Sequence, residues 1–427
     1  MTGSIIEFVR GRQVWDSRGR PTVEAEIILR DGSMGRAIAP AGASRGEAEA
    51  IELRDGGARL GGLGVDGAVR NVREPISDAL IGSDASDQRA VDQTLIELDG
   101  TRDKSRLGGN AMVAVSMAVA HAAASSARLP LYRYLSGDAV ERMPLPEIQI
   151  FGGGAHAGRR IDIQDLMIAC PAAGSFARAL EMTADVYRAA GQLMDEAGRL
   201  QGVADEGGFW PAFDSNEQAL ETLVRAIERA GYVPGEDVSI VLDIAASEFY
   251  RDGAYHLALD DRHIDSDGLC ALIGGWIDRF PIISVEDPLA ETDRAGTRAF
   301  TAALGDRVQI IGDDYLVTNA ERVVEAARDG ACNAVLIKPN QAGTLSEALD
   351  ALNAAHDAGW DAVVSARSGE TEDVTIVHLA VGWGAAQLKV GSFARSERMA
   401  KWNEALRIEE ALGSSARFAG AEVFPRG

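Results

Sequence analysis

The chain has 427 residues, a length that suits a small domain followed by a large one. Hydrophobic residues make up 46% and charged residues 25%, the balance of an ordinary globular protein with an adequate core. The net charge of −23, from 42 basic and 65 acidic residues, repels phosphate backbones and anionic lipid. We therefore expect no nucleic acid and no membrane as partners, and an anionic substrate would need bound cations or clustered Arg and Lys at its site.

The cysteines and the most apolar segment bear on the compartment. Cys170, Cys270 and Cys332 show no CxxC spacing, so a disulfide framework is not expected and a reducing compartment, the cytoplasm, fits. The N-terminus lacks the long apolar core of a signal peptide. Residues 111–127 are the most membrane-like stretch, but they are mostly Ala interrupted by Ser and His. We interpret them as a buried helix.

Residues 1–130 are predicted to form an α+β domain. Alternating patterns, with a turn signal at Asp31-Gly32, predict strands over residues 5–9, 23–29 and 36–40. Residues 41–46, Ala-Gly-Ala-Ser-Arg-Gly, form a flexible loop of small residues, and helical patterns then extend from Glu47 to about residue 127. Prolines flank a short link to a second domain, which we assign to residues 145–427.

The second domain shows a repeating rhythm. Short apolar runs rich in β-branched residues each end on a polar or charged residue, and helical patterns fill most of the intervals of 22 to 43 residues between them. The residues that end these runs are Asp243, Glu286, Asp313, Lys338, Arg367 and Lys389. Such a rhythm is typical of a parallel βα barrel, in which the C-terminal strand ends face one mouth. We expect these six side chains to converge there.

Three of these residues, Asp243, Glu286 and Asp313, are carboxylates. Carboxylates that are held together repel, and a divalent cation relieves the repulsion; ligation by oxygen alone favours Mg²⁺ or Mn²⁺ over zinc. Lys338 follows on the next strand and can act as a base where burial or neighbouring positive charge lowers its pKa. The alternative is that these are unrelated charges at strand ends.

Further polar residues complete a possible reaction site. Arg367-Ser368 and Lys389 offer donors for a carboxylate or a phosphate. Residues 152–156, Gly-Gly-Gly-Ala-His, match neither a dinucleotide fingerprint nor a phosphate loop, and could close over a substrate. A metal and a Lys base on one side, with Glu206 and Asp165 on the other, suit removal of a proton α to a carboxylate and expulsion of a leaving group.

Many segments resemble the enolase family, in one register from about residue 5 to residue 411. They include DSRG at 16–19, PTVE at 21–24, ELRDG at 52–56, LDGT at 98–101, DEGGF at 205–209, AASEFY at 245–250, EDPLAE at 286–291, GDD at 312–314, SGETED at 368–373 and RSER at 395–398. So many long matches in one register cannot arise by chance.

The resemblance implies an α/β protein with an N-terminal α+β capping domain and an enolase-type (β/α)8 barrel. It also implies dehydration of 2-phosphoglycerate to phosphoenolpyruvate with two Mg²⁺ ions, by a homodimer or octamer. Lys338 would remove the C2 proton. Glu206 would assist departure of the C3 hydroxyl, and Asp165 stands beside that leaving group.

The same resemblance supplies the binding residues. The first metal would be held by Asp243, Glu286 and Asp313. Arg367 and Ser368 match phosphate contacts, and Lys389 matches a contact to the substrate carboxylate. His156 and Gln164 match residues of the closing site. The expected partner is therefore a small anionic phosphorylated or phosphonylated carboxylate.

The sequence departs from the family pattern mainly near the leaving group and the second metal. The family has Glu at Asp165, His at Ala366 and Asn at Gly152. Its mobile loop reads Ser-Gly-Ala-Ser, with a first Ser near the second metal where Ala41 stands here, and Trp210 follows a motif that continues with Ala in the family. The base and the first-metal side are retained.

These departures favour a specialised paralogue that keeps enolate chemistry on a related substrate, such as the carboxyphosphonoenolpyruvate synthase of phosphonate biosynthesis. The alternative is a divergent phosphopyruvate hydratase that converts 2-phosphoglycerate to phosphoenolpyruvate in glycolysis. A non-catalytic enolase-like binding protein is the third hypothesis, and the retention of Lys338 and Glu206 argues against it.

Overall fold

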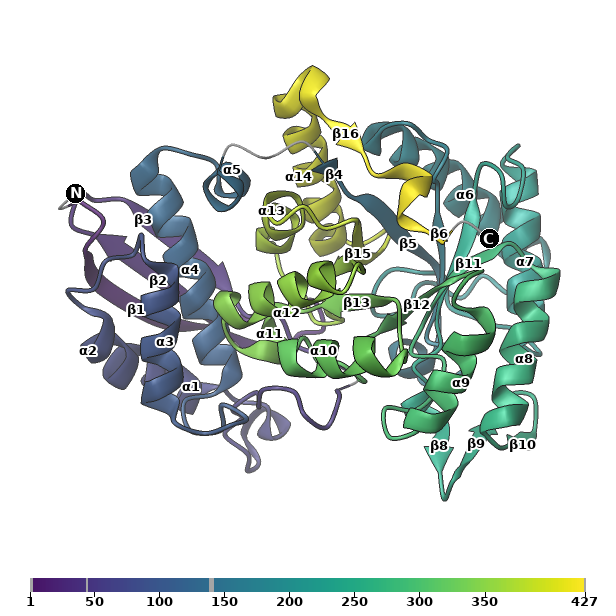
Figure 1. Ribbon diagram of the computed structural model, residues 1–427, viewed down its shortest axis with the longest axis horizontal. Helices are drawn as coiled ribbons and strands as arrows, with labels where there is room; N and C mark the ends of the chain where they lie inside the picture. The colour runs from purple at the N-terminus through teal and green to yellow at the C-terminus, as the bar shows by residue number, and fades with distance from the viewer. Residues whose placement is uncertain (1–2, 44, 138–141, 426–427) are drawn as a thin grey trace.

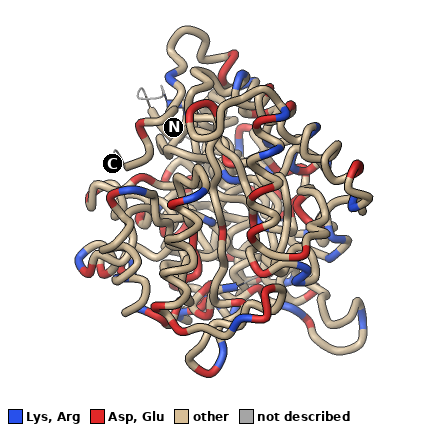
Figure 2. Tube along the Cα trace, turned by 90° about the vertical axis from the view of Figure 1, so that its right-hand side faces the viewer, with Lys and Arg blue, Asp and Glu red and all other residues tan. Residues whose placement is uncertain are grey.

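The computed structural model describes residues 3–43, 45–137 and 142–425. Ser44, in the loop predicted to be flexible, lies outside these ranges. A three-stranded sheet with its helices forms one end of the molecule, and a barrel surrounded by helices forms the other (Figure 1). Acidic and basic residues are interspersed along the chain rather than segregated by sign (Figure 2). The predicted α/β architecture, a capping domain followed by a barrel, is confirmed.

The N-terminal sheet is an antiparallel meander in the order β1-β2-β3, formed by β1 (Ile6–Trp15), β2 (Pro21–Leu29) and β3 (Met34–Ile38). The Ala-rich α4 (Gly109–Ala127) packs on β2 and β3. Among the described residues, α4 is the one helix long and apolar enough to cross a membrane, but 78% of its apolar window is buried, as in a core helix. The other helices are α1 (Asp66–Asn71), α2 (Ser77–Leu80), α3 (Gln88–Asp99) and α5 (Leu131–Ser136), with η1 (Arg59–Gly62) and η2 (Val72–Ile76).

The helix predicted from Glu47 is wrong for its first residues, because residues 47–58 are irregular. Their backbone groups bond to distant segments instead of to successive turns. The Ala50 N–H donates to the Gln341 carbonyl at 2.8 Å, and the Ile51 N–H donates to the Asp103 carbonyl at 2.7 Å. This segment therefore lies against the barrel, and it carries the buried Glu49.

The barrel closes in the order β11-β12-β13-β14-β15-β5-β6-β7. Its strands are β5 (Leu145–Gly152), β6 (Asp165–Ala169), β7 (Ser239–Asp243), β11 (Ile282–Glu286), β12 (Gln309–Gly312), β13 (Ala334–Ile337), β14 (Asp361–Ser365) and β15 (Gln387–Ser392). The prediction of a parallel barrel is right except at β6, which runs antiparallel to both neighbours. The βα rhythm could not reveal this reversal, since β5 connects directly to β6 without a covering α-helix.

Helices surround the barrel, and most of them begin where a Ser, Thr, Asp or Asn side chain accepts a backbone N–H of the first turn. These capping residues are Ser175, Ser215, Asp265, Asp293, Asn319 and Thr344. The helices are α6 (Phe176–Glu196), α7 (Asn216–Arg229), α8 (Ser266–Arg279), α9 (Arg294–Leu304), α10 (Ala320–Asp329), α11 (Pro339–Ala342), α12 (Leu345–Asp357), α13 (Thr375–Gly382) and α14 (Ser396–Leu412).

Short elements complete the chain. They are η3 (Gly154–Ala157), η4 (Ala246–Phe249), the small sheet of β8 (Tyr250–Arg251), β9 (Ala254–Leu257) and β10 (Arg262–Ile264), the pair of β4 (Arg142–Met143) and β16 (Arg417–Phe418), η5 (Gly413–Ser415) and η6 (Gly420–Val423). Helices α11 and α12 face α4 and α3, so the N-terminal domain packs on the side of the barrel that follows β13 (Figure 1).

Candidate active site

The barrel mouth collects the residues predicted at the strand ends. Asp243 ends β7 and pairs in register with Glu286, which ends β11. Asp313 follows β12 directly, and Lys338 follows β13. Lys389 differs from the prediction, because it lies inside β15 and the strand continues to Ser392 with a register shift after Lys389.

Asp165 reaches the same mouth by a different route. It is the first residue of β6, and because β6 is antiparallel, its N-terminal end lies where the other strands have their C-terminal ends. Asp165 accordingly pairs in register with Asp243. The reversed strand therefore brings a further buried carboxylate to the site, 1% exposed.

Lys389 lies among three carboxylates. Its Nζ donates to Asp243 Oδ2 at 2.8 Å and to Glu286 Oε2 at 2.7 Å, and it lies 3.6 Å from Asp165 Oδ2. Burial lowers the pKa of Lys389, but the charges of Asp243 and Glu286 outweigh it and raise the pKa well above its usual value. The side chain is therefore an ammonium ion that balances these acids.

Lys338 is paired in the same way. Its Nζ donates to Asp313 Oδ2, whose partner oxygen Oδ1 accepts from Gln341 Nε2 at 2.9 Å. Burial lowers the pKa of Lys338, but the charge of Asp313 more than offsets it, and the pKa is raised. That direction is opposite to what a base needs. A divalent cation on Asp313 would cancel the charge that raises this pKa.

The donor set of the three predicted ligands fits such a cation. Asp243, Glu286 and Asp313 are 2%, 1% and 5% exposed. The Oε1 atom of Glu286 is buried without a hydrogen-bond partner among the described residues. Burial and the charge of Asp243 raise the pKa of Glu286 well above its usual value. Buried carboxylate oxygens that lack a donor suit Mg²⁺, which binds oxygen ligands.

The tightest acidic groups in the described residues nevertheless differ from that predicted set. One is Asp287 with Asp313 and Asp314, and the other is His156 with Asp165 and Glu206; in each, ligand atoms lie within 4.8 Å of one another. Asp287 accepts the backbone N–H of Asp313 at 2.9 Å and of Asp314 at 2.8 Å, so it fixes the loop that carries the predicted ligand.

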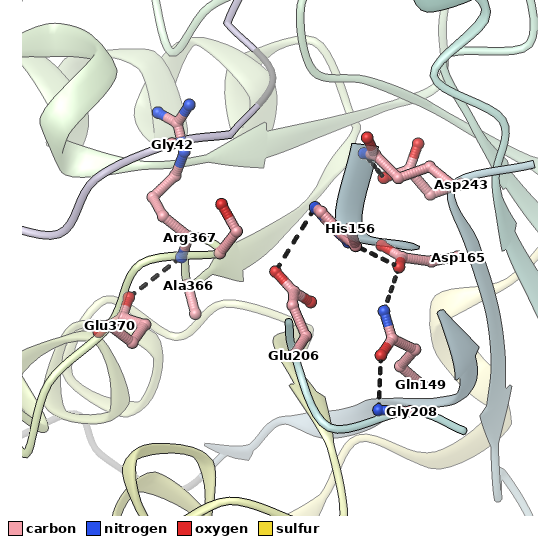
Figure 3. A network of polar contacts seen from close by, with 12 residues as sticks. Gly42, Gln149, His156, Asp165, Glu206, Gly208, Asp243, Ala366, Arg367 and Glu370 are labelled. Atoms are coloured by element: carbon pink, nitrogen blue, oxygen red, sulfur yellow. Dashed lines mark hydrogen bonds and ion pairs between the residues drawn. The ribbon is translucent and has the colours of Figure 1, made fainter. Parts of the chain in front are cut away.

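His156, on η3, lies between two acids. Its Nδ1 is 3.3 Å from Asp165 Oδ1, and its Nε2 is 3.8 Å from Glu206 Oε1 (Figure 3). Burial lowers the pKa of His156, but the charges of Glu206 and Asp165 raise it to about 9. Burial raises the pKa of Asp165, but the opposing effect of His156 is larger and brings this pKa well below its usual range. The arrangement is a buried imidazolium between two carboxylates.

The predicted binding residues have partners of their own. Gln164 Nε2 donates to Asp243 Oδ2 at 3.0 Å, and Ser368 Oγ accepts from Arg18 Nη1 at 3.1 Å. Arg367 donates from Nη1 and Nη2 to the two oxygens of Glu49, at 2.9 and 3.2 Å. Glu49 comes from the irregular segment of the N-terminal domain, so both domains build this part of the site.

One pocket unites these side chains. All of the predicted site residues line it except Glu286 and Asp313, which accept hydrogen bonds from Lys389 and Lys338. Ala366 and Ala43 also line it. Ala41 does not belong to this lining; it is buried, and its backbone N–H and carbonyl bond to Gly369 at 2.9 and 2.8 Å. Ala41 therefore lies outside the pocket lining that contains Ala43 and Ala366.

Comparison with known proteins agrees with this geometry. Residues 6–135 match the enolase N-terminal domain, and residues 140–426 match the enolase C-terminal TIM barrel domain. The chain belongs to the enolase family. It is 50% identical over 427 residues to Enolase 1 of Desulfitobacterium hafniense (strain Y51), a match that covers 99% of this chain and 98% of that relative. The prediction of an enolase-family enzyme is confirmed, and enolase-family enzymes generally use Mg²⁺.

Two buried residues of the site were not singled out from the sequence. Glu49 was hidden in a segment predicted to be helical. Gln149 lies on β5, where it bonds to Asp165 and Gly208 (Figure 3). A signal for Gln149 did exist, because Glu147 and Gln149 alternate with apolar residues in a fully buried strand and so share one face of it.

Proposed function

We propose that this enolase-family enzyme removes the proton α to the carboxylate of a small phosphorylated carboxylate, such as 2-phosphoglycerate, and expels the β-hydroxyl as water. The observation that carries the proposal is the shared pocket. Lys338 lies in its wall together with Glu206, His156 and Asp165. A base and an acidic group around one substrate are what such an elimination requires.

The proton inventory balances on these residues. The C2–H bond breaks, its proton passes to the neutral amine of Lys338, a state that a cation on Asp313 would favour, and the electron pair moves toward the substrate carboxylate. That pair then forms the C2–C3 double bond as the C3–O bond breaks. The buried imidazolium of His156, 3.8 Å from the Glu206 carboxylate, passes a proton to Glu206, and Glu206 gives it to the departing hydroxyl, which leaves as water.

Mg²⁺ held by Asp243, Glu286 and Asp313 would supply positive charge for the substrate carboxylate as it gains electron density. In this proposal Lys389 binds that carboxylate, and Arg367 and Ser368 bind the phosphate. In the same proposal Gln164 orients the site through its bond to Asp243, and His156 orients it through its contact with Asp165. Clustered cations at the mouth would thus attract an anion in spite of the negative net charge.

A second candidate is a specialised paralogue that acts on a phosphonylated carboxylate, as in carboxyphosphonoenolpyruvate synthase. The observation that favours it is Ala366, which lines the pocket where the family has His. Two other departures from the family pattern, at Ala41 and Asp165, give this second candidate less support. Ala41 lies away from the pocket lining, and Asp165 is held in the site by Gln149 and His156.

One experiment separates the two candidates. Wild type, Ala366→His and the control Ala41→Ser are incubated with 2-phosphoglycerate and Mg²⁺, and formation of phosphoenolpyruvate is measured. Equal, rapid turnover in all three supports the dehydratase. Slow turnover that rises about 10- to 100-fold only in Ala366→His supports the specialised paralogue, on the scale of an electrostatic contact regained. Absence of phosphoenolpyruvate and of C2-proton exchange in wild type would reject the proposed reaction.

We further propose that the enzyme works as a homodimer or octamer in the cytoplasm. Phe8 and Trp15 of β1 are 51% and 54% exposed, and large apolar side chains on one strand are a common feature of subunit contacts. The three cysteines are unpaired, which fits a reducing compartment. A monomeric mass in solution at micromolar concentration would contradict the assembly.

A further inference from the structure

Gln149 bonds both to Asp165 and to the turn that carries Glu206, the two acids on either side of His156. It is fully buried on β5. Its Oε1 accepts the backbone N–H of Gly208 at 2.9 Å, and its Nε2 donates to Asp165 Oδ1 (Figure 3). An N–H can donate only to the amide oxygen, so the Gly208 contact fixes the orientation of the amide and turns its NH₂ group toward the carboxylate.

The surrounding backbone is shaped around this amide. A Cβ atom at Gly208 would lie 2.4 Å from Gln149 Oε1. A Cβ atom at Gly152 would lie 3.1 Å from the same oxygen and 2.7 Å from the Ala204 Cβ. Glycine is thus required where the chain approaches the amide this closely. Gly152, where the family has Asn, gives up a side chain at the place that the Gln149 amide fills.

The contacts of Gln149 extend to both acids that face His156. Asp165 Oδ1 accepts from Gln149 and lies 3.3 Å from His156 Nδ1. Gly208 belongs to the turn that carries Glu206, a turn closed by the Ala204 N–H on the Gly208 carbonyl at 2.7 Å. Gln149 therefore spans from the turn of Glu206 to the side chain of Asp165. The long amide compensates for an aspartate that is one methylene shorter than the family's Glu.

We infer that Gln149 is a positioning residue that sets the separation of Asp165 and Glu206, and thereby the position of His156 between them. This inference rests on the proposed function for its effect on catalysis. A side chain that fixes the supports of an acidic group changes the step in which that group acts more than it changes the proton transfer to Lys338.

The test exchanges the lengths of the two side chains. Gln149→Asn and Asp165→Glu each alter the span by one methylene, and the double variant restores it. With 2-phosphoglycerate and Mg²⁺ in D₂O, each single variant is expected to form phosphoenolpyruvate about 10- to 100-fold more slowly, with exchange of the C2 hydrogen slowed much less than elimination. The double variant is expected to return to within severalfold of wild type. Gln149→Glu, of the same shape but with an oxygen facing Asp165, should be slow as well.

A second measurement needs no turnover. The proton NMR signal of the His156 ring N–H, assigned by its absence in His156→Gln, should shift in Gln149→Asn and return in the double variant. Failure of wild type to form phosphoenolpyruvate would count against the proposed function, and the NMR comparison would still decide the role of Gln149. Equal loss of exchange and elimination without recovery in the double variant, or an unmoved His156 signal in Gln149→Asn, would overturn the inference.

Discussion

Acidification is expected to destabilise the interface between the two domains, because it favours protonation of His378 on α13. Its ring stacks on Tyr132 of α5 at 6.1 Å and meets His121 of α4 edge-on at 6.2 Å. Its Nε2 lies 3.5 Å from Glu404, while Nδ1 has no hydrogen-bond partner among the described residues. Burial and His121 lower the pKa of His378 to about 4, although Glu404 and Asp373 oppose the shift.

The magnitude follows from the difference between the folded and unfolded chains. A histidine that titrates at 6.5 in the unfolded chain and at about 4 in the folded chain contributes about 3 to 4 kcal/mol to the free energy of unfolding, at roughly 1.4 kcal/mol per unit of pKa. The unfolded chain binds the proton first as the pH falls. The contribution is therefore complete above pH 6.5 and is lost as the pH drops through that value toward 4. His121, whose pKa burial also lowers, adds in the same direction.

The assay is the midpoint of thermal unfolding between pH 7 and pH 4.5, for wild type and His378→Phe. Phenylalanine keeps a ring on Tyr132 but cannot take up a proton. We expect the midpoint temperature of His378→Phe to fall less than that of wild type on acidification. His263→Phe, at an exposed histidine, is the matched control and should follow wild type. Identical pH profiles for wild type and His378→Phe would refute the reasoning.

Three further predictions concern the catalytic mouth. Mg²⁺ should stabilise the fold by about 2.7 kcal/mol at a hundredfold excess over its Kd, and Asp313→Ala should abolish this thermal shift; no shift of wild type at millimolar Mg²⁺ would contradict the metal site. Lys338→Ala should slow exchange of the C2 proton by about 10²- to 10⁴-fold, whereas Glu206→Gln should slow elimination more than exchange; wild-type exchange in Lys338→Ala would exclude it as the base. Glu49→Gln should raise the KM for 2-phosphoglycerate about tenfold, because two charge-assisted bonds orient Arg367; an unchanged KM would show that this arginine needs no such support.

The convergence of strand-end residues could be predicted from the sequence because it depends only on the direction of parallel strands. Asp243, Glu286 and Lys338 illustrate this, since each ends or directly follows a strand at the mouth. The place of Asp165 could not be predicted in that way, because it depends on the reversal of β6. The contact of Glu49 with Arg367 could not be predicted either, because it joins residues 318 positions apart and Glu49 lies in an irregular segment.

The charge balance at the mouth links metal and substrate binding. The structure pairs Lys389 with Asp243 and Glu286, and Lys338 with Asp313, so the lysines neutralise the same carboxylates that Mg²⁺ would bind. An ion that takes over those carboxylates would release the Lys389 ammonium group for an anion and would allow Lys338 to lose its proton and act as the base. Because an anionic substrate gains the Lys389 ammonium group only when Asp243 and Glu286 have another cation, metal and substrate would each favour the other's binding. A protein with a net charge of −23 would in this way bind an anion at a buried site that contains several carboxylates.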